Sequence, residues 1–152
     1  MEQASSELAV LVRAGPHLCA LPVGAVLETL RPLPLRPLAG APAGVSGIAV
    51  VRGAPVPVID LAVLVGGVPG ASSTHRWVMV RCGARAAALA VDSVIGIRAL
   101  PPGAAIAPLV AGAARGALAE LRVHDAELAL VLEASRLVPE GVFEALQRET
   151  VP

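Results

Sequence analysis

A repeated segment is the feature that most limits how this chain can fold. Residues 10–26 (VLVRAGPHLCALPVGAV) align without a gap with residues 78–94 (VMVRCGARAAALAVDSV), at a constant offset of 68, and eight of the seventeen positions are identical. Each copy has two β-rich apolar runs on either side of a glycine, Gly15 or Gly83. Such runs are typical of a strand–turn–strand unit. The sequence therefore predicts a duplicated hairpin.

The segment after the first copy, residues 47–61 (GIAVVRGAPVPVIDL), predicts another hairpin. It holds two short apolar runs on either side of Arg52-Gly53-Ala54-Pro55, and runs around a Gly/Pro cluster are typical of two strands and a tight turn. Pro57 lies within the second run. Because proline has no N–H to donate to a neighbouring strand, we expect an edge or a bulge there.

A matching hairpin is predicted after the second copy. Its strands are expected at 117–123 and 127–132, around His124-Asp125. Gly116 stands in the place that Gly47 has in the first hairpin. Each copy of the repeat is thus followed by a further hairpin of similar length.

These patterns predict a mainly β domain of two similar lobes with about five short strands each. We place the first lobe at about 8–65 and the second at about 76–133. Small five-stranded lobes usually close into barrels, because closure removes exposed sheet edges. A short C-terminal helix is expected at about 139–148, with its apolar residues on one face against a lobe or between the lobes.

Composition excludes several classes of function. The formal net charge is zero and all twelve cations are arginine, so no basic field attracts nucleic acid or a membrane surface, and no lysine chemistry is available. A membrane-spanning helix needs about 18 consecutive apolar residues, and no stretch reaches that length. The N-terminus also lacks the basic region of a signal peptide. We therefore expect a cytoplasmic protein without membrane insertion.

Side chains that could support catalysis are few and scattered. No two of the three histidines have metal-ligand spacing, so no metal or cofactor is expected. His17 and Cys19 share one strand face, but no third group that would orient a Cys–His dyad is evident. Asp92 lies at a strand end, where a turn or cap role is expected. Cys19 and Cys82 are expected to be free thiols. We expect no enzyme, and a protein that presents surfaces to other proteins.

Three groups of residues carry a resemblance to a known family. They are Gly47-Ile48 with Arg52-Gly53 and Val56-Pro57-Val58-Ile59-Asp60-Leu61, then Leu21-Pro22-Val23 with Val26-Leu27-Glu28, and finally Ala90-Val91-Asp92-Ser93-Val94. On these motifs the chain resembles the chemotaxis coupling proteins, the CheW-like domain family, over about residues 8–138. The resemblance implies two SH3-like five-stranded β-barrels with a hydrophobic groove between them.

The same resemblance implies a non-enzymatic adaptor that needs no cofactor. Such a protein links the cytoplasmic tip of methyl-accepting chemoreceptors to the regulatory domain of a CheA-type histidine kinase, and is associated with receptor arrays in the cytoplasm. Other CheW-like proteins are further expected partners. Whether the output is flagellar chemotaxis or surface motility stays open.

The resemblance also assigns positions for receptor or kinase binding. These are Val26, Glu28, Gly47, Arg52, Gly53, Val94, Ile97 and Gly116. Glu28 and Arg52 fall on paired charges of the family, and opposite charges on adjacent strands of one lobe can form an ion pair. We predict that they pair and that the pair positions the Arg52 turn for a partner. For the apolar positions, packing in the core is an equal alternative.

The sequence departs from the family pattern at several places. Val50-Val51 stands where Asn-Leu is usual, and Ala88 where a glycine is usual. The alternatives are therefore a divergent member that binds the receptor but not the kinase and modulates array assembly, or a scaffold that competes with a true adaptor. A small ligand-binding or enzymatic β-barrel is a further alternative, which a cluster of His17, Cys19 or Asp92 facing one cavity would favour.

Overall fold

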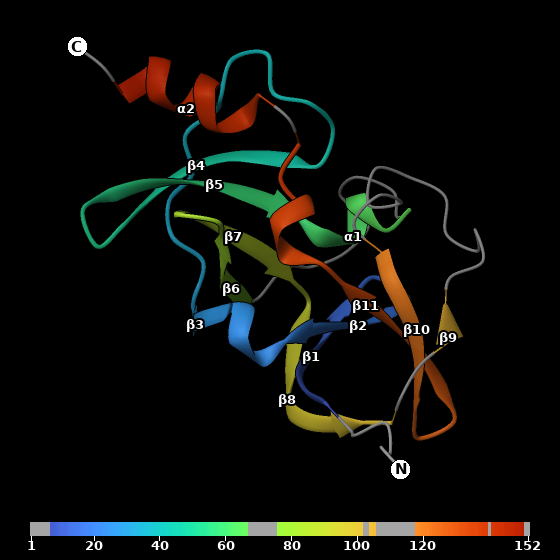
Figure 1. The fold of residues 1–152 in the computed structure, drawn as a ribbon. Coiled ribbons are helices and arrows are strands. Elements are labelled where there is room, and N and C mark those ends of the chain that lie inside the picture. Colours follow the sequence, from blue (N-terminus) through green and yellow to red (C-terminus); the bar gives the residue numbers. More distant parts are fainter. Residues whose placement is uncertain (1–6, 67–75, 102–103, 106–117, 140, 151–152) are drawn as a thin grey trace.

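The computed structural model describes residues 7–66, 76–101, 104–105, 118–139 and 141–150 (Figure 1). The strands are β1 (Glu7–Ala14), β2 (His17–Pro22), β3 (Val26–Leu30), β4 (Val45–Val51), β5 (Ala54–Asp60), β6 (Arg76–Cys82), β7 (Arg85–Val91), β8 (Ser93–Leu100), β9 (Ala104–Ala105), β10 (Leu118–His124) and β11 (Glu127–Leu132). The helices are α1 (Leu61–Leu64) and α2 (Val142–Thr150), with 3-10 turns η1 (Val23–Ala25) and η3 (Ala134–Arg136).

The strands form two sheets, each of which curls around its own apolar core. One sheet has the order β8-β1-β2-β11-β10-β9, and we call it the N/C lobe because its strands come from both ends of the chain. The other has the order β3-β6-β7-β5-β4 and is the central lobe. Figure 1 shows the blue β1–β2 hairpin beside the orange β10–β11 hairpin. The predicted fold of two SH3-like lobes is confirmed, with the two-residue strand β9 added to one of them.

The strands are divided between the lobes differently from the predicted ranges of about 8–65 and about 76–133. The strands of the central lobe come from residues 26–91, and those of the N/C lobe come from 7–22 and 93–132. Consecutive strands usually neighbour each other, but β2 already has β1 on one side and β11 on the other. Both edges of β2 are therefore paired, and β3 joins the other sheet. The chain enters the central lobe at η1 and goes back to the N/C lobe between β7 and β8.

The duplicated hairpin predicted from the repeat is confirmed. β1–β2 corresponds to β6–β7, and both are antiparallel pairs joined by a tight turn. The strand that follows each hairpin begins in the same way, since Val26 lies opposite Val80 in β6 and Val94 lies opposite Val12 in β1. The later hairpins β4–β5 and β10–β11 also correspond, because each has a two-residue turn and a register shift near its start.

The two repeated hairpins bury both of their faces. Side chains alternate along a strand, so that Leu11 lies inside the N/C lobe while Val12 packs in the layer between the lobes. Met79 and Val80 divide in the same way between the central lobe and that layer. A fully buried side chain of this size stabilises the fold by about 1.5–3 kcal/mol. Burial on both faces explains why these strands are almost continuously apolar.

Pro57 lies where strand β5 has a local edge, as its place in the sequence predicts. Val51 and Ala54 flank the two-residue turn and form the hydrogen-bonded pair that closes the hairpin. The hydrogen-bonding direction alternates along the strand, so Pro55 and Pro57 face away from β4 and toward β7. Neither has an N–H group, and the pairing of β5 with β7 begins only at Val58.

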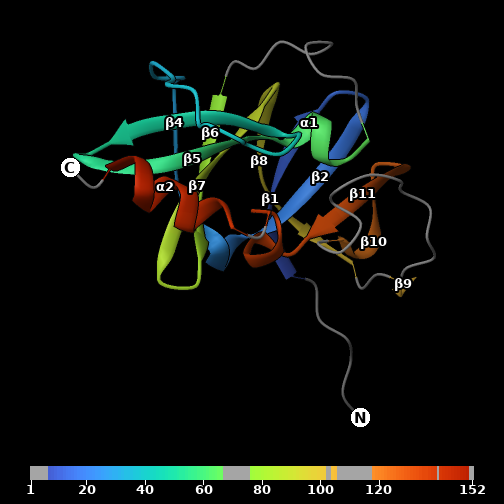
Figure 2. The ribbon, with the colours of Figure 1, turned by 90° about the horizontal axis from the view of Figure 1, so that it is seen from above.

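The predicted C-terminal helix is confirmed as α2, which packs on the central lobe. Val142 and Leu146 are buried against Leu38 and Ile48, and Figure 2 shows the helix lying along β5. The guanidinium carbon of Arg85 lies 5.0 Å from the centre of the Phe143 ring on the same helix. No helix in the described part of the chain is long and apolar enough to cross a membrane.

Candidate protein-binding surface

An ion pair joins the two edges of the central lobe. Nη2 of Arg52 lies 2.8 Å from Oε1 of Glu28, which confirms the predicted pairing. The two residues are not on adjacent strands, because β3 and β4 are the outermost strands of the sheet and Arg52 lies in the β4–β5 turn. The sheet curls until its edges approach, and the ion pair forms across this closure.

The backbone at Arg52 adopts a conformation that is unfavourable for its residue type. Arg52 has φ 52° and Gly53 has φ 80°, the two positive values of a type I′ hairpin turn. The left-handed region costs a residue other than glycine about 1–2 kcal/mol. The Arg52 side chain is 75% exposed, and an exposed ion pair contributes only about 0.2–1 kcal/mol. The arginine is therefore not explained by stability, whereas Gly53 is explained by its φ.

Gly47 has a structural explanation. A Cβ at this position would overlap the carbonyl oxygen of Arg36. That close approach arises because Arg36 and Ile48 exchange two backbone hydrogen bonds, of 2.8 and 2.7 Å. The glycine is thus required for the connection between β3 and β4 to pass over β4.

The remaining assigned positions do not form one patch with Glu28 and Arg52. Val26 and Val94 are half-buried and pack against the layer between the lobes, each at the start of a strand that leaves that layer. Ile97 is 55% exposed on the edge strand β8 of the N/C lobe. Gly116 lies outside the described residues. The structure therefore brings together Glu28, Arg52 and Gly53, and distributes the others.

Each lobe also exposes an apolar pair beside a hairpin turn, which the sequence reading missed. In the N/C lobe Val123 and Leu128 lie opposite each other and are 50% and 56% exposed. In the central lobe the corresponding pair is Val50, 58% exposed, and Pro55. Alignment of the two hairpins on their turns would have found these positions. In each hairpin the exposed pair is next to the residue pair that flanks the two-residue turn, on the side away from the turn.

A second ion pair lies in the N/C lobe. Arg13 donates two hydrogen bonds to the carboxylate of Glu127, of 2.5 and 2.7 Å, and reaches across β2 to do so. This hydrogen bonding lowers the pKa of Glu127 and raises the pKa of Arg13. The pair ties the first strand to the last hairpin, and no local pattern in the sequence indicates it.

The groups considered for catalysis do not assemble. Cys19 packs in the layer between the lobes, where burial raises its thiol pKa to about 12, and burial raises the pKa of Cys82 to about 11. Both cysteines are free thiols, as predicted, and they stay protonated near neutral pH, so neither supplies a thiolate nucleophile. Oδ2 of Asp92 accepts a hydrogen bond of 3.2 Å from the N–H of Gly15 in the β1–β2 turn, so Asp92 joins two hairpins that are distant in sequence instead of capping a local turn as expected. In the described ranges no three His, Cys, Asp or Glu side chains could hold a metal ion.

The fold and its surfaces define a two-lobed β scaffold whose exposed features are hairpin turns, apolar pairs and a surface ion pair. A family model described as the CheW-like domain matches residues 8–141, and the chain belongs to this family. No curated protein matches the chain. The crystal structure of the scaffolding protein TtCheW from Thermoanaerobacter tengcongensis matches with a TM-score of 0.70 and 20% identity, over 84% of this chain and 88% of that one. At this identity the likeness shows the shared fold.

Proposed function

We propose that this chain is a non-enzymatic adaptor that couples chemoreceptors to a CheA-type histidine kinase. Its family and its two-lobed fold support this class of function. The observation that indicates which surface binds a partner is the Glu28–Arg52 ion pair. The pair holds an exposed arginine on a turn, and it does not offset the cost of the backbone conformation there. We therefore assign Arg52 to a contact outside the chain.

An adaptor needs two separate contact surfaces, and each lobe has one exposed hairpin that we assign to this role. The central lobe offers the Arg52 turn with the apolar pair of Val50 and Pro55. The N/C lobe offers the corresponding hairpin, where Val123 and Leu128 are exposed and the turn has no arginine. The lobes thus share an architecture but differ in surface chemistry. This difference suits two partners, the receptor tip and the regulatory domain of the kinase, at receptor arrays in the cytoplasm.

Binding of the purified chain to a receptor cytoplasmic fragment and to the kinase regulatory domain tests the proposal. Biolayer interferometry should detect binding to both partners. Arg52→Glu should weaken at least one interaction by about tenfold or more, because it removes a charged donor and places a second carboxylate beside Glu28. Arg31→Glu is the matched control, since Arg31 is also exposed but lies outside the hairpin.

The charge reversal can be checked with a second variant. Glu28→Arg combined with Arg52→Glu restores an ion pair but moves the positive charge to β3. If the position of the cation matters, the double variant stays folded and binds weakly. Absence of binding to either partner by the unmodified chain would contradict the adaptor role, and binding to the receptor alone would identify the divergent form of adaptor.

A further inference from the structure

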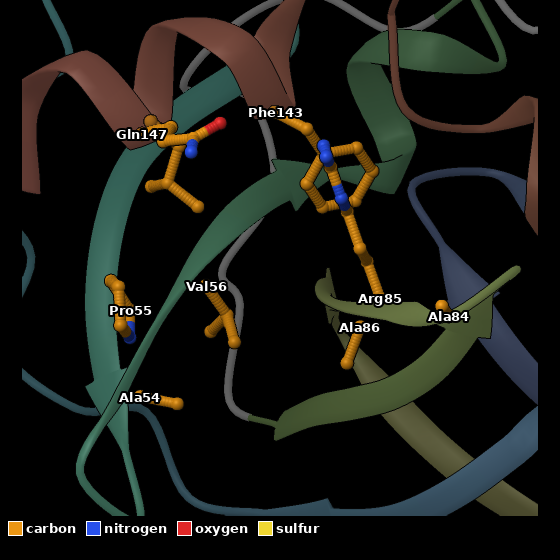
Figure 3. A pocket seen from close by; sticks show the side chains of 9 residues that line it. Ala54, Pro55, Val56, Ala84, Arg85, Ala86, Phe143 and Gln147 are labelled. Atoms are coloured by element: carbon orange, nitrogen blue, oxygen red, sulfur yellow. The ribbon is translucent and has the colours of Figure 1, made fainter.

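A groove opens in the central lobe where β5 and β7 separate beneath helix α2. Ala54, Val56 and Ala86 line it from the two strands, and Phe143 and Leu146 line it from the helix, around a volume of about 480 Å³. Figure 3 shows the strands diverging on either side of the groove, with Val56 and Ala86 pointing into it. This volume lies within the about 300–1,000 Å³ of ligand pockets.

Residue types in β5 and at the start of β7 explain why the groove is open. Pro55 and Pro57 face β7 but have no N–H to donate, and pairing with β7 begins only beyond them, at Val58. On the opposite wall, Ala84 and Ala86 carry side chains too small to fill the space. The groove is thus a consequence of residue choice in the two strands rather than of a loose helix.

The groove combines an apolar lining with one fixed positive charge. Arg85 is the only charged residue among those that line it, and Figure 3 shows its side chain against the ring of Phe143. Stacking on an aromatic ring restrains a guanidinium while leaving its N–H donors available. Among the residues that the structure describes, no carboxylate or carbonyl accepts a hydrogen bond from Arg85.

The charges of the surrounding lobe indicate the sign of a partner. Residues 26–91 contain six arginines and two carboxylates. Both carboxylates are engaged, since Glu28 pairs with Arg52 and Asp60 accepts hydrogen bonds at the start of α1. Residues 26–91 therefore carry a net positive charge, and α2 adds both Glu144 and Arg148. The charge at the groove itself is Arg85, which complements a segment that is both acidic and apolar.

We propose that the α2 groove binds a short peptide segment of a partner protein in which a carboxylate lies close to an apolar side chain. The apolar side chain enters between Val56 and Phe143, and the carboxylate accepts hydrogen bonds from Arg85. The helical wall of the groove lies beyond residue 141, where the match to the family model ends. The inference goes beyond the proposed coupling of receptor and kinase, because the groove opens between β5, β7 and α2 and shares only Pro55 with the apolar pair beside the Arg52 turn.

Selection of short random peptides displayed on phage against the immobilised full chain tests this site. The selected peptides should carry Asp or Glu beside Leu, Ile or Phe. A fluorescent copy of the best peptide, titrated by anisotropy, should bind Arg85→Gln about tenfold or more weakly, since a hydrogen bond to a charged group is lost. Binding should also weaken as salt is raised. Arg76→Gln is the matched control, because Arg76 is exposed at the end of the β6–β7 hairpin that lies away from Arg85.

A second variant separates loss of binding from loss of structure. Arg85→Gln also removes the contact with Phe143, and this could weaken binding by loosening α2. Ala54→Trp is therefore tested as well, because it fills the groove and leaves Arg85 unchanged. Both variants should abolish or strongly weaken binding while unfolding at a midpoint close to that of the unmodified chain. The site is refuted if no peptide prefers the unmodified chain over Arg85→Gln, if the selected peptides lack acidic residues, or if Arg76→Gln weakens binding equally.

Discussion

Replacing Arg52 with asparagine should separate the stability of the β4–β5 turn from its use in binding. Asn-Gly is the dipeptide that best fits a type I′ turn, so Arg52→Asn relieves part of the about 1–2 kcal/mol that the left-handed backbone costs. The variant also loses an exposed ion pair worth about 0.2–1 kcal/mol. The two changes have opposite signs, and the free energy of unfolding should stay within about 1 kcal/mol of the original value.

Urea unfolding followed by tryptophan fluorescence measures this directly, because Trp77 is the single tryptophan and is buried in the central lobe. The melting temperature should move by no more than about 4 °C in a chain of this size, while receptor or kinase binding falls. Gly53→Ala is the opposite control, since it keeps Arg52 but strains a backbone with φ 80° and should lower stability. A loss above about 3 kcal/mol in Arg52→Asn, or unchanged binding, would refute the assignment of Arg52 to partner contact.

Three further predictions concern packing and titration. Gly47→Ala should destabilise the chain by more than about 2 kcal/mol in urea unfolding, because its Cβ would overlap a backbone carbonyl. Burial raises the thiol pKa of Cys19 from 9.0 to about 12 and that of Cys82 from 9.0 to about 11. Because the unfolded chain loses these protons at lower pH than the folded chain, the free energy of unfolding should fall as the pH rises above about 9, and it should fall less in Cys19→Ala. The lowered pKa of Glu127 has the opposite consequence: its contribution is present above the unfolded pKa near 4.5 and is lost as the pH falls below it, and Glu127→Gln should remove this part of the acid sensitivity while Arg13 stays in place.

The local elements of this fold could be predicted from the sequence, but the division of strands between lobes could not. Alternation, turn residues and the repeat indicated the hairpins and the C-terminal helix, because these depend on residues close together in the chain. The parallel pairing of β11 with β2 and of β5 with β7 joins residues that are distant in sequence. Each repeat supplies two hairpins, and nothing local specifies which hairpins share a sheet.

The candidate surface divides in the same way. The pairing of Glu28 with Arg52 was predicted because a motif placed both residues, although their positions at opposite edges of the sheet were not. Gly47 was assigned to binding, but its close approach to a backbone carbonyl gives it a structural role. The α2 groove was missed, because its walls come from three elements that meet only through tertiary packing.

The split origin of the N/C lobe determines the order in which the chain can fold as it leaves the ribosome. The central lobe has all of its strands once residue 91 has been made, whereas the N/C lobe must wait for β11 at residue 132. Translation proceeds at about 5–20 residues per second, so hairpin β1–β2 exists for several seconds with apolar faces that its final neighbours do not yet cover. The first strands of this domain to be synthesised therefore wait longest for their neighbours, and their apolar faces stay uncovered for longest in the nascent chain.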